Sequence, residues 1–377
     1  MNKSWQFYNP VRVYFDSLSK LKEIVSADSV LLVTTPGTSR RGVSEKVTNL
    51  LSETRVEVYD RVTPNPSFRQ LESARDELAC SENMTLIGLG GGSAMDSAKA
   101  FSLLLHPLGK SFKLGEHLKN STPLPSFKPL DLITIPTTSG TGGEVTPFAT
   151  VWDEEARKKY SLAGENIFAG TALLDPELTK TLPPVVTVSG GLDALSQCLE
   201  SIWNKNSTRI TAGWALEGIK LVLEFLPVAL NNPQDLSARS NLMQASLLSG
   251  LAISQTRTAL AHSISYPLTA RFGLPHGLAC GFTLPEILRF NADAALVPSH
   301  PFVSLPDKLG FAGHRQFADE LEAWLDKIQI NSWLDKYLPD SVRLEELSGE
   351  MYTPQRAGNN IRSVSETDIK RIITASL

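Results

Sequence analysis

Short apolar runs alternate with helical stretches through the first half of the sequence. Ser29 to Thr34 is apolar and rich in β-branched residues, and a helical pattern follows from Val43 to Leu51. Val56 to Tyr59 and Met84 to Leu89 repeat the strand pattern, and Ser93 to Leu105 has the periodicity of a helix. This alternation predicts a mostly parallel, doubly wound α/β sheet.

The segments around this third strand add local detail. Ser93 is the expected N-cap of its helix, with Asp96 at the capping-box position. Residues 107–129 are rich in Lys, Pro and Ser and predict a loop, and Asp131 to Pro136 predicts a further buried strand.

The composition and periodicity of the sequence change after Pro183 and Pro184. Glycine becomes rarer and long helical periodicity takes over, in residues 188–203, 208–226, 233–261 and 315–328. We therefore expect two domains, an α/β domain over residues 1–185 and an all-helical domain over residues 186–377.

Composition excludes several classes of function. A net charge of -4 with dispersed Lys and Arg gives no footprint for nucleic acid or a membrane surface, so a small-molecule partner is expected. Three widely spaced cysteines do not suit a disulfide framework or a CxxC metal site. The opening residues lack the apolar core of a signal peptide, and no apolar run is long enough to span a membrane. These features together favour the cytoplasm.

Two glycine-rich turns follow strands and could hold phosphate groups. Gly90 to Ser93 places backbone N–H groups and a helix N-terminus where an anion can approach, although a purely structural turn is equally compatible. The segment TIPTTSGTGGEVTPF adds the hydroxyls of Thr137, Thr138, Ser139 and Thr141. Two such loops favour a dinucleotide, even though the GxGxxG fingerprint and its later acidic residue are absent.

A second group of residues could bind a metal ion. Asp193 and Gln197 lie four residues apart on an expected helix and therefore share one face. His262 and His276 lie beside proline and glycine, near expected helix ends. An aspartate with two histidines is a suitable ligand set for Zn²⁺ or Fe²⁺. Spacing alone leaves a capping aspartate and structural histidines as an open alternative.

Four motifs in order resemble those of the iron-containing alcohol dehydrogenase family: GGGSAMDSAK, PTTSGTGGEVT, GGLDAL and LPHG. The resemblance covers nearly the entire chain. It implies a Rossmann-like dinucleotide-binding domain, an all-helical C-terminal domain of the dehydroquinate synthase-like architecture, and a metal ion in the cleft between them. It also implies NAD(P), one divalent metal that is Fe²⁺ or Zn²⁺, a homodimer, and interconversion of a small aldehyde and its alcohol.

The resemblance carries over to individual positions. The cofactor contacts it implies, together with the neighbouring residues of the same motifs, are Thr35, Asn65, Gly91, Gly92, Ser93, Asp96, Thr137, Thr138, Thr141, Thr146 and Lys159. The metal ligands it implies are Asp193, Gln197, His262 and His276. For Lys159, a solvated lysine in a charged run is the alternative.

Three positions depart from the family pattern. Gln197 stands where histidine is usual, and an amide oxygen is a weaker ligand than imidazole. Tyr266 replaces a histidine, so any proton relay there passes to the phenol or to water. Thr35 replaces an aspartate that favours NAD, and with Arg40 and Arg41 close by this leans the preference toward NADP.

The substrate is suggested by arginines. Arg257 and Arg271 each precede a ligand histidine by five residues, and a guanidinium could clamp an anionic substrate at Arg257. For Arg271 a surface salt bridge is the favoured reading. The segments FYNPVRVYF and TRTALAHSISYPLTARFGLPHGLACGFTLPE resemble the phosphonate-metabolism branch of the family, which implies reduction of phosphonoacetaldehyde to 2-hydroxyethylphosphonate. Cys198 and Cys280 are expected to be buried packing residues.

Other functions stay open on the sequence alone. The chain could be a general short-chain alcohol or lactaldehyde dehydrogenase. Outside that class it could be a lyase like dehydroquinate synthase, a metal-free reductase like the maleylacetate reductases, or an NAD(P)-binding module without activity.

Overall fold

The computed structural model describes residues 5–156, 158–339 and 341–377. It divides the chain into two compact units. We call Asn9–Thr138 with Gly143–Thr181 the sheet unit, and Met1–Tyr8, Ser139–Gly142 and Leu182–Leu377 the helical unit. The boundary at residue 185 between folding domains stays a prediction. The prediction that the N-terminal segment is not a signal peptide falls partly on residues 1–4, which lie outside the described residues.

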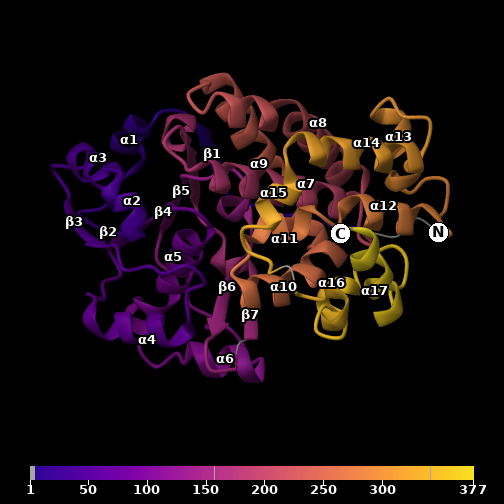
Figure 1. Cartoon of the computed structure of the whole chain (residues 1–377). Coiled ribbons are helices and arrows are strands. Elements are labelled where there is room, and N and C mark those ends of the chain that lie inside the picture. Colours follow the sequence, from indigo (N-terminus) through magenta and orange to yellow (C-terminus); the bar gives the residue numbers. More distant parts are fainter. Residues whose placement is uncertain (1–4, 157, 340) are drawn as a thin grey trace. The chain divides into compact units, whose positions relative to one another are not determined.

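The sheet unit contains a six-stranded, fully parallel sheet (Figure 1). Its strand order is β1-β8-β5-β4-β2-β3. The bounds are β1 Arg12–Phe15, β2 Ser29–Thr34, β3 Arg55–Tyr59, β4 Met84–Gly90, β5 Leu132–Pro136 and β8 Thr171–Leu174. The predicted parallel sheet is confirmed, together with four predicted strands, which correspond to β2, β3, β4 and β5.

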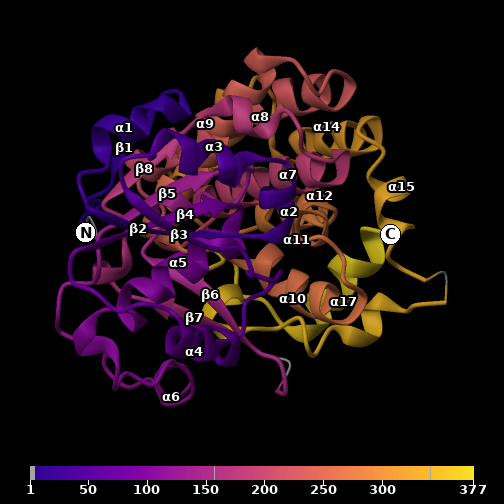
Figure 2. The same ribbon diagram turned by 90° about the vertical axis from the view of Figure 1, so that its left-hand side faces the viewer.

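Helices cover both faces of this sheet, as Figures 1 and 2 show. Their bounds are α1 Leu21–Ile24, α2 Pro36–Arg40, α3 Val43–Leu50, α4 Phe68–Glu77, α5 Gly92–Leu104 and α6 Leu114–Asn120. Alternate residues of β2 serve opposite faces, since Val30 and Leu32 join the core under α1 and α3 while Leu31 and Val33 join the core under α4, α5 and α6.

The strand order creates a switch point between β2 and β4. The chain runs from β2 to β3 on one side and then returns to place β4 on the other side of β2. In open parallel sheets, ligands bind outside the carboxyl ends of the strands at such a point. Here those ends lead into Thr35 and into the turn at Gly91, and Thr34 Oγ1 donates a hydrogen bond to Leu89 O between them at 2.7 Å.

Three details of the sheet unit differ from expectation. The predicted loop at 107–129 contains α6, whose buried Leu114 and Leu118 lie one turn apart. The N-cap of α5 is Gly91 rather than Ser93, because the helix already begins at Gly92. An antiparallel hairpin, β6 Phe148–Asp153 and β7 Lys158–Ala163, was not predicted.

As predicted, the secondary-structure elements described in the helical unit are helices. The long helices α7 Pro184–Ile202, α8 Arg209–Asn231 and α9 Leu236–Thr256 pack on one another. The shorter ones are α10 Leu260–Phe272, α11 His276–Gly281, α12 Leu284–Ala292, α13 Leu305–Lys308, α14 His314–Lys327, α15 Ile330–Leu334, α16 Pro354–Ala357 and α17 Glu366–Ala375. One continuous apolar core lies within this unit.

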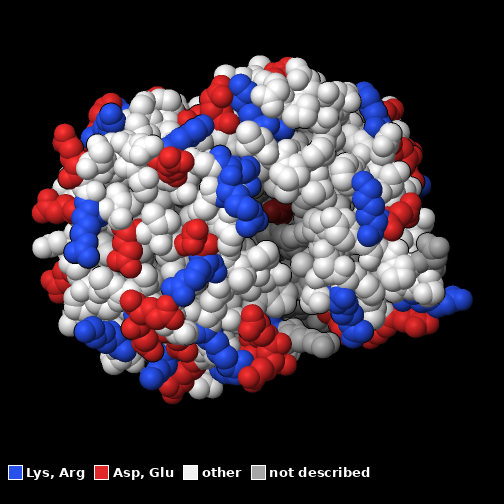
Figure 3. Space-filling model, turned by 60° about the vertical axis from the view of Figure 1, so that its left-hand side comes forward, with Lys and Arg blue, Asp and Glu red and all other residues white. Residues whose placement is uncertain are grey.

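The distribution of charge can be followed on one face of the molecule. On the face in Figure 3, basic and acidic side chains are interspersed, with no large area of one sign. Among the described residues, no helix combines the length and the apolar character needed to cross a membrane. A homodimeric state and a cytoplasmic location stay predictions.

Candidate metal centre and cofactor loops

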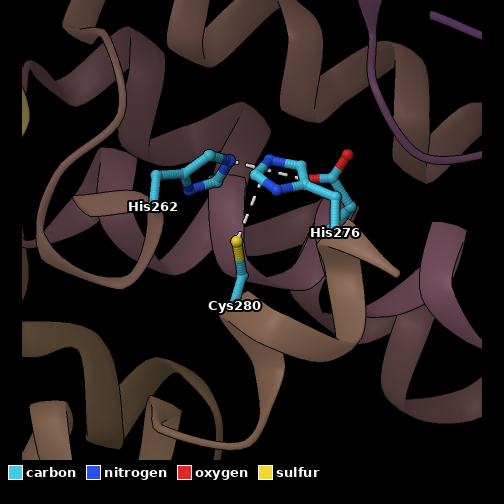
Figure 4. A group of neighbouring side chains, drawn as sticks. His262, His276 and Cys280 are labelled. Atoms are coloured by element: carbon cyan, nitrogen blue, oxygen red, sulfur yellow. Dashed lines mark hydrogen bonds and ion pairs between the residues drawn. The ribbon is translucent and has the colours of Figure 1, made fainter. Parts of the chain in front are cut away.

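Four donor side chains meet within the helical unit. Asp193 lies on α7, His262 on α10, and His276 and Cys280 on α11, and one ligand atom of each lies within 4.8 Å of the others. Figure 4 shows the two imidazoles and the thiol turned toward one another. The structure thus brings together the predicted ligands Asp193, His262 and His276 and adds a cysteine, and the fourth predicted ligand, Gln197, is hydrogen-bonded to Asp193.

A glycine allows α11 to approach α7 closely. A Cβ atom at Gly277 would lie 1.7 Å from Ser189 O, which no side chain could accommodate without moving the helix. Instead, the Gly277 N–H donates a hydrogen bond to Ser189 Oγ at 3.1 Å. This contact holds His276 beside Asp193.

Neighbouring groups orient both histidines. Glu200 Oε2 lies 2.6 Å from His262 Nδ1, so the Nε2 atom of that ring faces Asp193 Oδ1 at 3.4 Å. Ser265 Oγ lies 3.4 Å from His276 Nδ1, which leaves His276 Nε2 toward the cluster. A carboxylate or hydroxyl behind a ligand imidazole is the usual support of a metal site.

The donor set fits a divalent cation. Asp193 is buried, and His262 Nε2 lies 3.4 Å from its Oδ1. A buried carboxylate is costly unless a cation is paired with it. Asp, His and Cys donors are all ligands that zinc accepts, and Asp and His also suit iron.

The electrostatics of the cluster agree with this need for positive charge. Burial opposes ionisation of Asp193, but the imidazoles of His262 and His276 hold the pKa of its carboxyl below the usual value. Burial disfavours charged His262, but Cys280 and Glu200 raise the pKa of that imidazole well above its ordinary value. Protons and a metal ion therefore compete for these sites.

The amide of Gln197 is occupied by protein partners. Its oxygen accepts a hydrogen bond from Ser249 Oγ at 2.8 Å, and its nitrogen donates to Thr141 O at 3.4 Å. Its predicted role as the remaining ligand stays a prediction.

The two buried cysteines of the helical unit differ. Cys198 lies in the apolar core, where burial raises the pKa of its thiol, as expected for a packing residue. Cys280 is buried in the same core, as expected, but its Sγ also belongs to the donor cluster and lies 4.0 Å from His276 Nε2. Burial opposes ionisation of Cys280, yet His262 and His276 lower the pKa of its thiol to about 6.

Tyr266 links Arg356 to the cluster, and Arg257 lies near Arg356. The Tyr266 ring stacks on His276 with centroids 6.4 Å apart, and its hydroxyl accepts a hydrogen bond from Arg356 Nε at 3.0 Å. Burial and the neighbouring charge of Arg356 lower the pKa of Arg257. Arg257 also has a φ of 66°, which is uncommon outside glycine and often marks a functional position. By contrast Arg271 is exposed and pairs with Glu350, as the sequence favoured.

The predicted phosphate loops meet at the carboxyl end of β4. A Cβ atom at Gly91 would lie 3.2 Å from Thr138 Oγ1, and Thr137 N donates to Gly90 O at 2.9 Å. The Asn65 N–H lies 3.4 Å from Ser93 Oγ. These predicted contacts, with Gly92 between them, surround one helix N-terminus where a phosphate can bind.

A buried ionic network lies behind this loop. Lys99 is fully buried and donates to Gly143 O at 2.6 Å, Thr146 O at 2.8 Å and Phe148 O at 2.9 Å. Asp96 accepts a hydrogen bond from the Thr150 N–H at 2.8 Å. Asp96 and Thr146 therefore support the loop, and their role as cofactor contacts stays a prediction. Burial raises the pKa of Asp96 to about 6, and the charges of Lys99 and Lys159 oppose this rise.

Glu144 belongs to the same network and makes stability depend on pH. Burial raises its pKa from 4.5 to about 7, against its own backbone hydrogen bond and Lys99, and its Oε2 has no hydrogen-bond partner in the described residues. A carboxyl with a raised folded pKa contributes stability below pH 4.5 that is lost as pH rises through 7.

We therefore expect Glu144→Gln to gain stability relative to the wild type by about 2–3 kcal/mol between pH 5 and 8.5. Urea unfolding at several pH values measures this difference. Exposed Glu116→Gln is the control, and parallel pH profiles for wild type and Glu144→Gln would contradict the expectation.

The end of β2 carries the predicted cofactor-preference residues. Thr35 Oγ1 caps α2 by accepting a hydrogen bond from the Thr38 N–H at 3.2 Å. Arg41 Nη2 donates to Thr38 Oγ1 at 3.4 Å, and Arg41 Nε is buried without a hydrogen-bond partner among the described residues.

Sequence reasoning missed Glu200, Arg356 and Lys99. Glu200 follows Asp193 by seven residues, two helical turns, and this spacing was a usable signal. Lys99 stands inside the GGGSAMDSAK motif, where a lysine in an apolar helix is unusual. No local pattern connects Arg356 to the cluster, because it comes from a distant segment.

The fold and the donor cluster together define a nucleotide-linked metal oxidoreductase class. The model of the iron-containing alcohol dehydrogenase family matches residues 10–176, and the model of the C-terminal part of this family matches residues 187–377. The chain therefore belongs to the iron-containing alcohol dehydrogenase family and is an oxidoreductase. A dehydroquinate synthase-like lyase is not favoured by these matches.

Individual relatives carry different activities. A phosphonoacetaldehyde reductase of Streptomyces viridochromogenes is 36% identical over 273 residues, covering 70% of this chain and 67% of the relative. An aldehyde-alcohol dehydrogenase 2 of Entamoeba histolytica is 33% identical over 77% of this chain, but the match spans only 34% of that protein's length. A sulfoacetaldehyde reductase of Bifidobacterium kashiwanohense, solved in complex with NAD⁺, superposes with a TM-score of 0.86 at 27% identity, over 99% of each chain.

Proposed function

We propose that this chain uses a nicotinamide cofactor and a divalent metal to reduce a small aldehyde that bears an anionic group. The specific reaction proposed is phosphonoacetaldehyde to 2-hydroxyethylphosphonate. The relatives that act on phosphonoacetaldehyde and sulfoacetaldehyde support this choice of substrate class.

The neighbouring guanidinium groups of Arg257 and Arg356 carry the proposal. Burial and the neighbouring charge of Arg356 lower the pKa of Arg257, and an anion between the two guanidinium groups would stabilise both charges. Guanidinium groups match the oxygens of a phosphonate or sulfonate with paired hydrogen bonds. Because Tyr266 stacks on His276 and accepts a hydrogen bond from Arg356, the Arg356 guanidinium lies next to the donor cluster.

The proposed reaction adds hydride to the carbonyl carbon, so the C=O π electrons move to the oxygen, which then takes a proton. A divalent metal held by the cluster would polarise the carbonyl and stabilise that developing charge. Arg257 and Arg356 would hold the anionic end of the substrate. Tyr266 would supply the proton directly or through water, and Arg356 would stabilise the negative charge left on its oxygen.

For the cofactor, NADP is proposed over NAD. Thr35 stands at the end of β2 in place of a carboxylate that would repel a 2′-phosphate. Arg41 offers a buried Nε without a partner among the described residues, beside Arg40. A higher kcat/KM with NADPH than with NADH is the expected result, and the reverse ratio would reject this preference.

The test of function compares phosphonoacetaldehyde, sulfoacetaldehyde, lactaldehyde and propanal with metal-reconstituted enzyme. Phosphonoacetaldehyde is expected to have the highest kcat/KM. Arg257→Ala should lower its kcat/KM by about tenfold to hundredfold, with little change for propanal, because a charged hydrogen bond contributes about 1.5–3 kcal/mol.

Arg271→Ala is the matched control, since this arginine pairs with Glu350 at the surface. Equal losses on charged and neutral aldehydes would reject the clamp. Comparable rates for the wild type on all four aldehydes would favour a general alcohol or lactaldehyde dehydrogenase. Full activity without metal would favour the maleylacetate reductase-like alternative, and cofactor binding without turnover the non-catalytic one.

A further inference from the structure

The donor cluster holds one side chain that has no role in the ligand set expected from the family. Cys280 follows His276 by four residues on α11, so both side chains project from one face of the same helix. Its Sγ is one of the four ligand atoms that lie within 4.8 Å of one another. We infer that the Cys280 thiolate is the fourth protein ligand of the metal ion, in the place expected for Gln197.

The distances between donors support this assignment. Around a tetrahedral zinc ion, nitrogen and oxygen ligands lie about 3.3 Å apart, and nitrogen and sulfur ligands about 3.6 Å apart. His262 Nε2 and Asp193 Oδ1 are 3.4 Å apart, and His276 Nε2 and Cys280 Sγ are 4.0 Å apart. The four ligand atoms lie within 4.8 Å of one another, so side-chain shifts of about 1 Å would bring them to one ion, which the substrate carbonyl would join as a fifth ligand.

The surroundings of Gln197 argue against it as the competing ligand. Its amide oxygen already accepts a hydrogen bond from Ser249, and its amide nitrogen points to Thr141 O. To ligate, the amide would have to turn, and its oxygen would lose the Ser249 donor and face the carbonyl oxygen of Thr141. The Cys280 thiol reaches the cluster without breaking such a pair.

The donor chemistry favours the same choice. A thiolate is a stronger ligand for zinc and iron than a neutral amide oxygen, because it carries charge and a soft, polarisable donor atom. The ligand set Asp193, His262, His276 and Cys280 therefore restores the affinity that glutamine in place of histidine would lower.

Cobalt substitution provides a test that does not depend on turnover. Cobalt(II) bound to a thiolate has a near-ultraviolet charge-transfer band that oxygen and nitrogen ligands do not produce. We expect this band in the cobalt-loaded wild type and in Gln197→Ala. Cys280→Ala should lack the band. It should also bind cobalt at least about 100-fold more weakly, because loss of a residue that only supports a ligand already lowers metal affinity by about 10-fold to 100-fold.

Cys80→Ser is the matched control, because this half-buried thiol lies in the sheet unit and should leave the band unchanged. Circular dichroism of Cys280→Ala and Cys280→Ser confirms that both variants fold.

The inference rests on the metal centre of the proposed function, and the outcomes separate the two. Cobalt binding without the band in the wild type overturns the Cys280 assignment alone, as does an unchanged band in Cys280→Ala. A wild type that binds no cobalt, zinc or iron overturns the metal centre as well.

Discussion

Asp193→Ala and His262→Ala are each expected to remove the bound metal and to lower kcat by about a thousandfold or more. Stabilisation of charge by a metal ion supplies several kcal/mol to the transition state, and each 1.36 kcal/mol corresponds to about tenfold in rate. Both residues are buried in the donor cluster, with His262 Nε2 3.4 Å from Asp193 Oδ1. Metal analysis of the purified variants and steady-state kinetics measure the two losses.

Cofactor binding should survive both substitutions, because the predicted phosphate contacts at Gly91, Gly92 and Ser93 belong to the sheet unit. Fluorescence titration with NADPH checks this. His314→Ala is a suitable control, since its ring stacks on Phe302 and bonds Phe302 O rather than joining the cluster. Retention of metal and turnover in either Asp193→Ala or His262→Ala would remove the basis for the site.

Lys99→Met is expected to lower the free energy of unfolding by about 3–5 kcal/mol, the usual loss when one member of a buried ionic network is removed. Methionine keeps the length of the side chain but leaves the carbonyl oxygens of Gly143, Thr146 and Phe148 without their shared donor. Burial raises the pKa values of Asp96 and Glu144, and the substitution also removes the positive charge that opposes this rise. Urea unfolding measures the change.

The loop that Lys99 holds should also loosen, so limited proteolysis between Gly143 and Phe148 is expected to become faster. Exposed Lys46→Met, on α3, controls for the loss of one lysine. If Lys99→Met cannot be purified, the same proteolysis on Lys99→Arg gives the comparison, because arginine keeps the charge but not the compact ammonium group. Stability within about 0.5 kcal/mol of wild type would show that the network is not needed.

The regular parts of the fold were predictable from periodicity. Strands β2, β4 and β5 are nearly continuous apolar runs, as expected where helices cover both faces, and long helices such as α7 show their own period. The hairpin β6–β7 was missed although Phe148–Asp153 alternates between half-buried and buried positions, because its partner strand begins with two lysines. Helix α6 was missed because Lys and Pro around it outweighed Leu114 and Leu118.

The site was predictable where a single residue type signals its chemistry. Asp193, His262 and His276 are recognisable as possible ligands, and the structure brings them together. Cys280 was read as a packing residue, because a lone cysteine in an apolar helix usually is one. The N-cap prediction at Ser93 is wrong by two residues, since the chain turns at Gly90, with φ 151°, and Gly91 is the N-cap of the helix. Arg356 could not be found, because its contact with Tyr266 spans 90 residues of chain.

The residues expected to set cofactor preference and those predicted to bind the metal share no helix or strand. Thr35, Arg40 and Arg41 follow β2 in the sheet unit, and the predicted metal ligands lie on α7, α10 and α11. Substitutions that change preference between the two nicotinamide cofactors can therefore accumulate without disturbing the metal ligands, and the reverse holds for exchange of a ligand such as histidine for glutamine. Cofactor preference and the identity of the metal ligands can thus change independently of each other among proteins that share this fold.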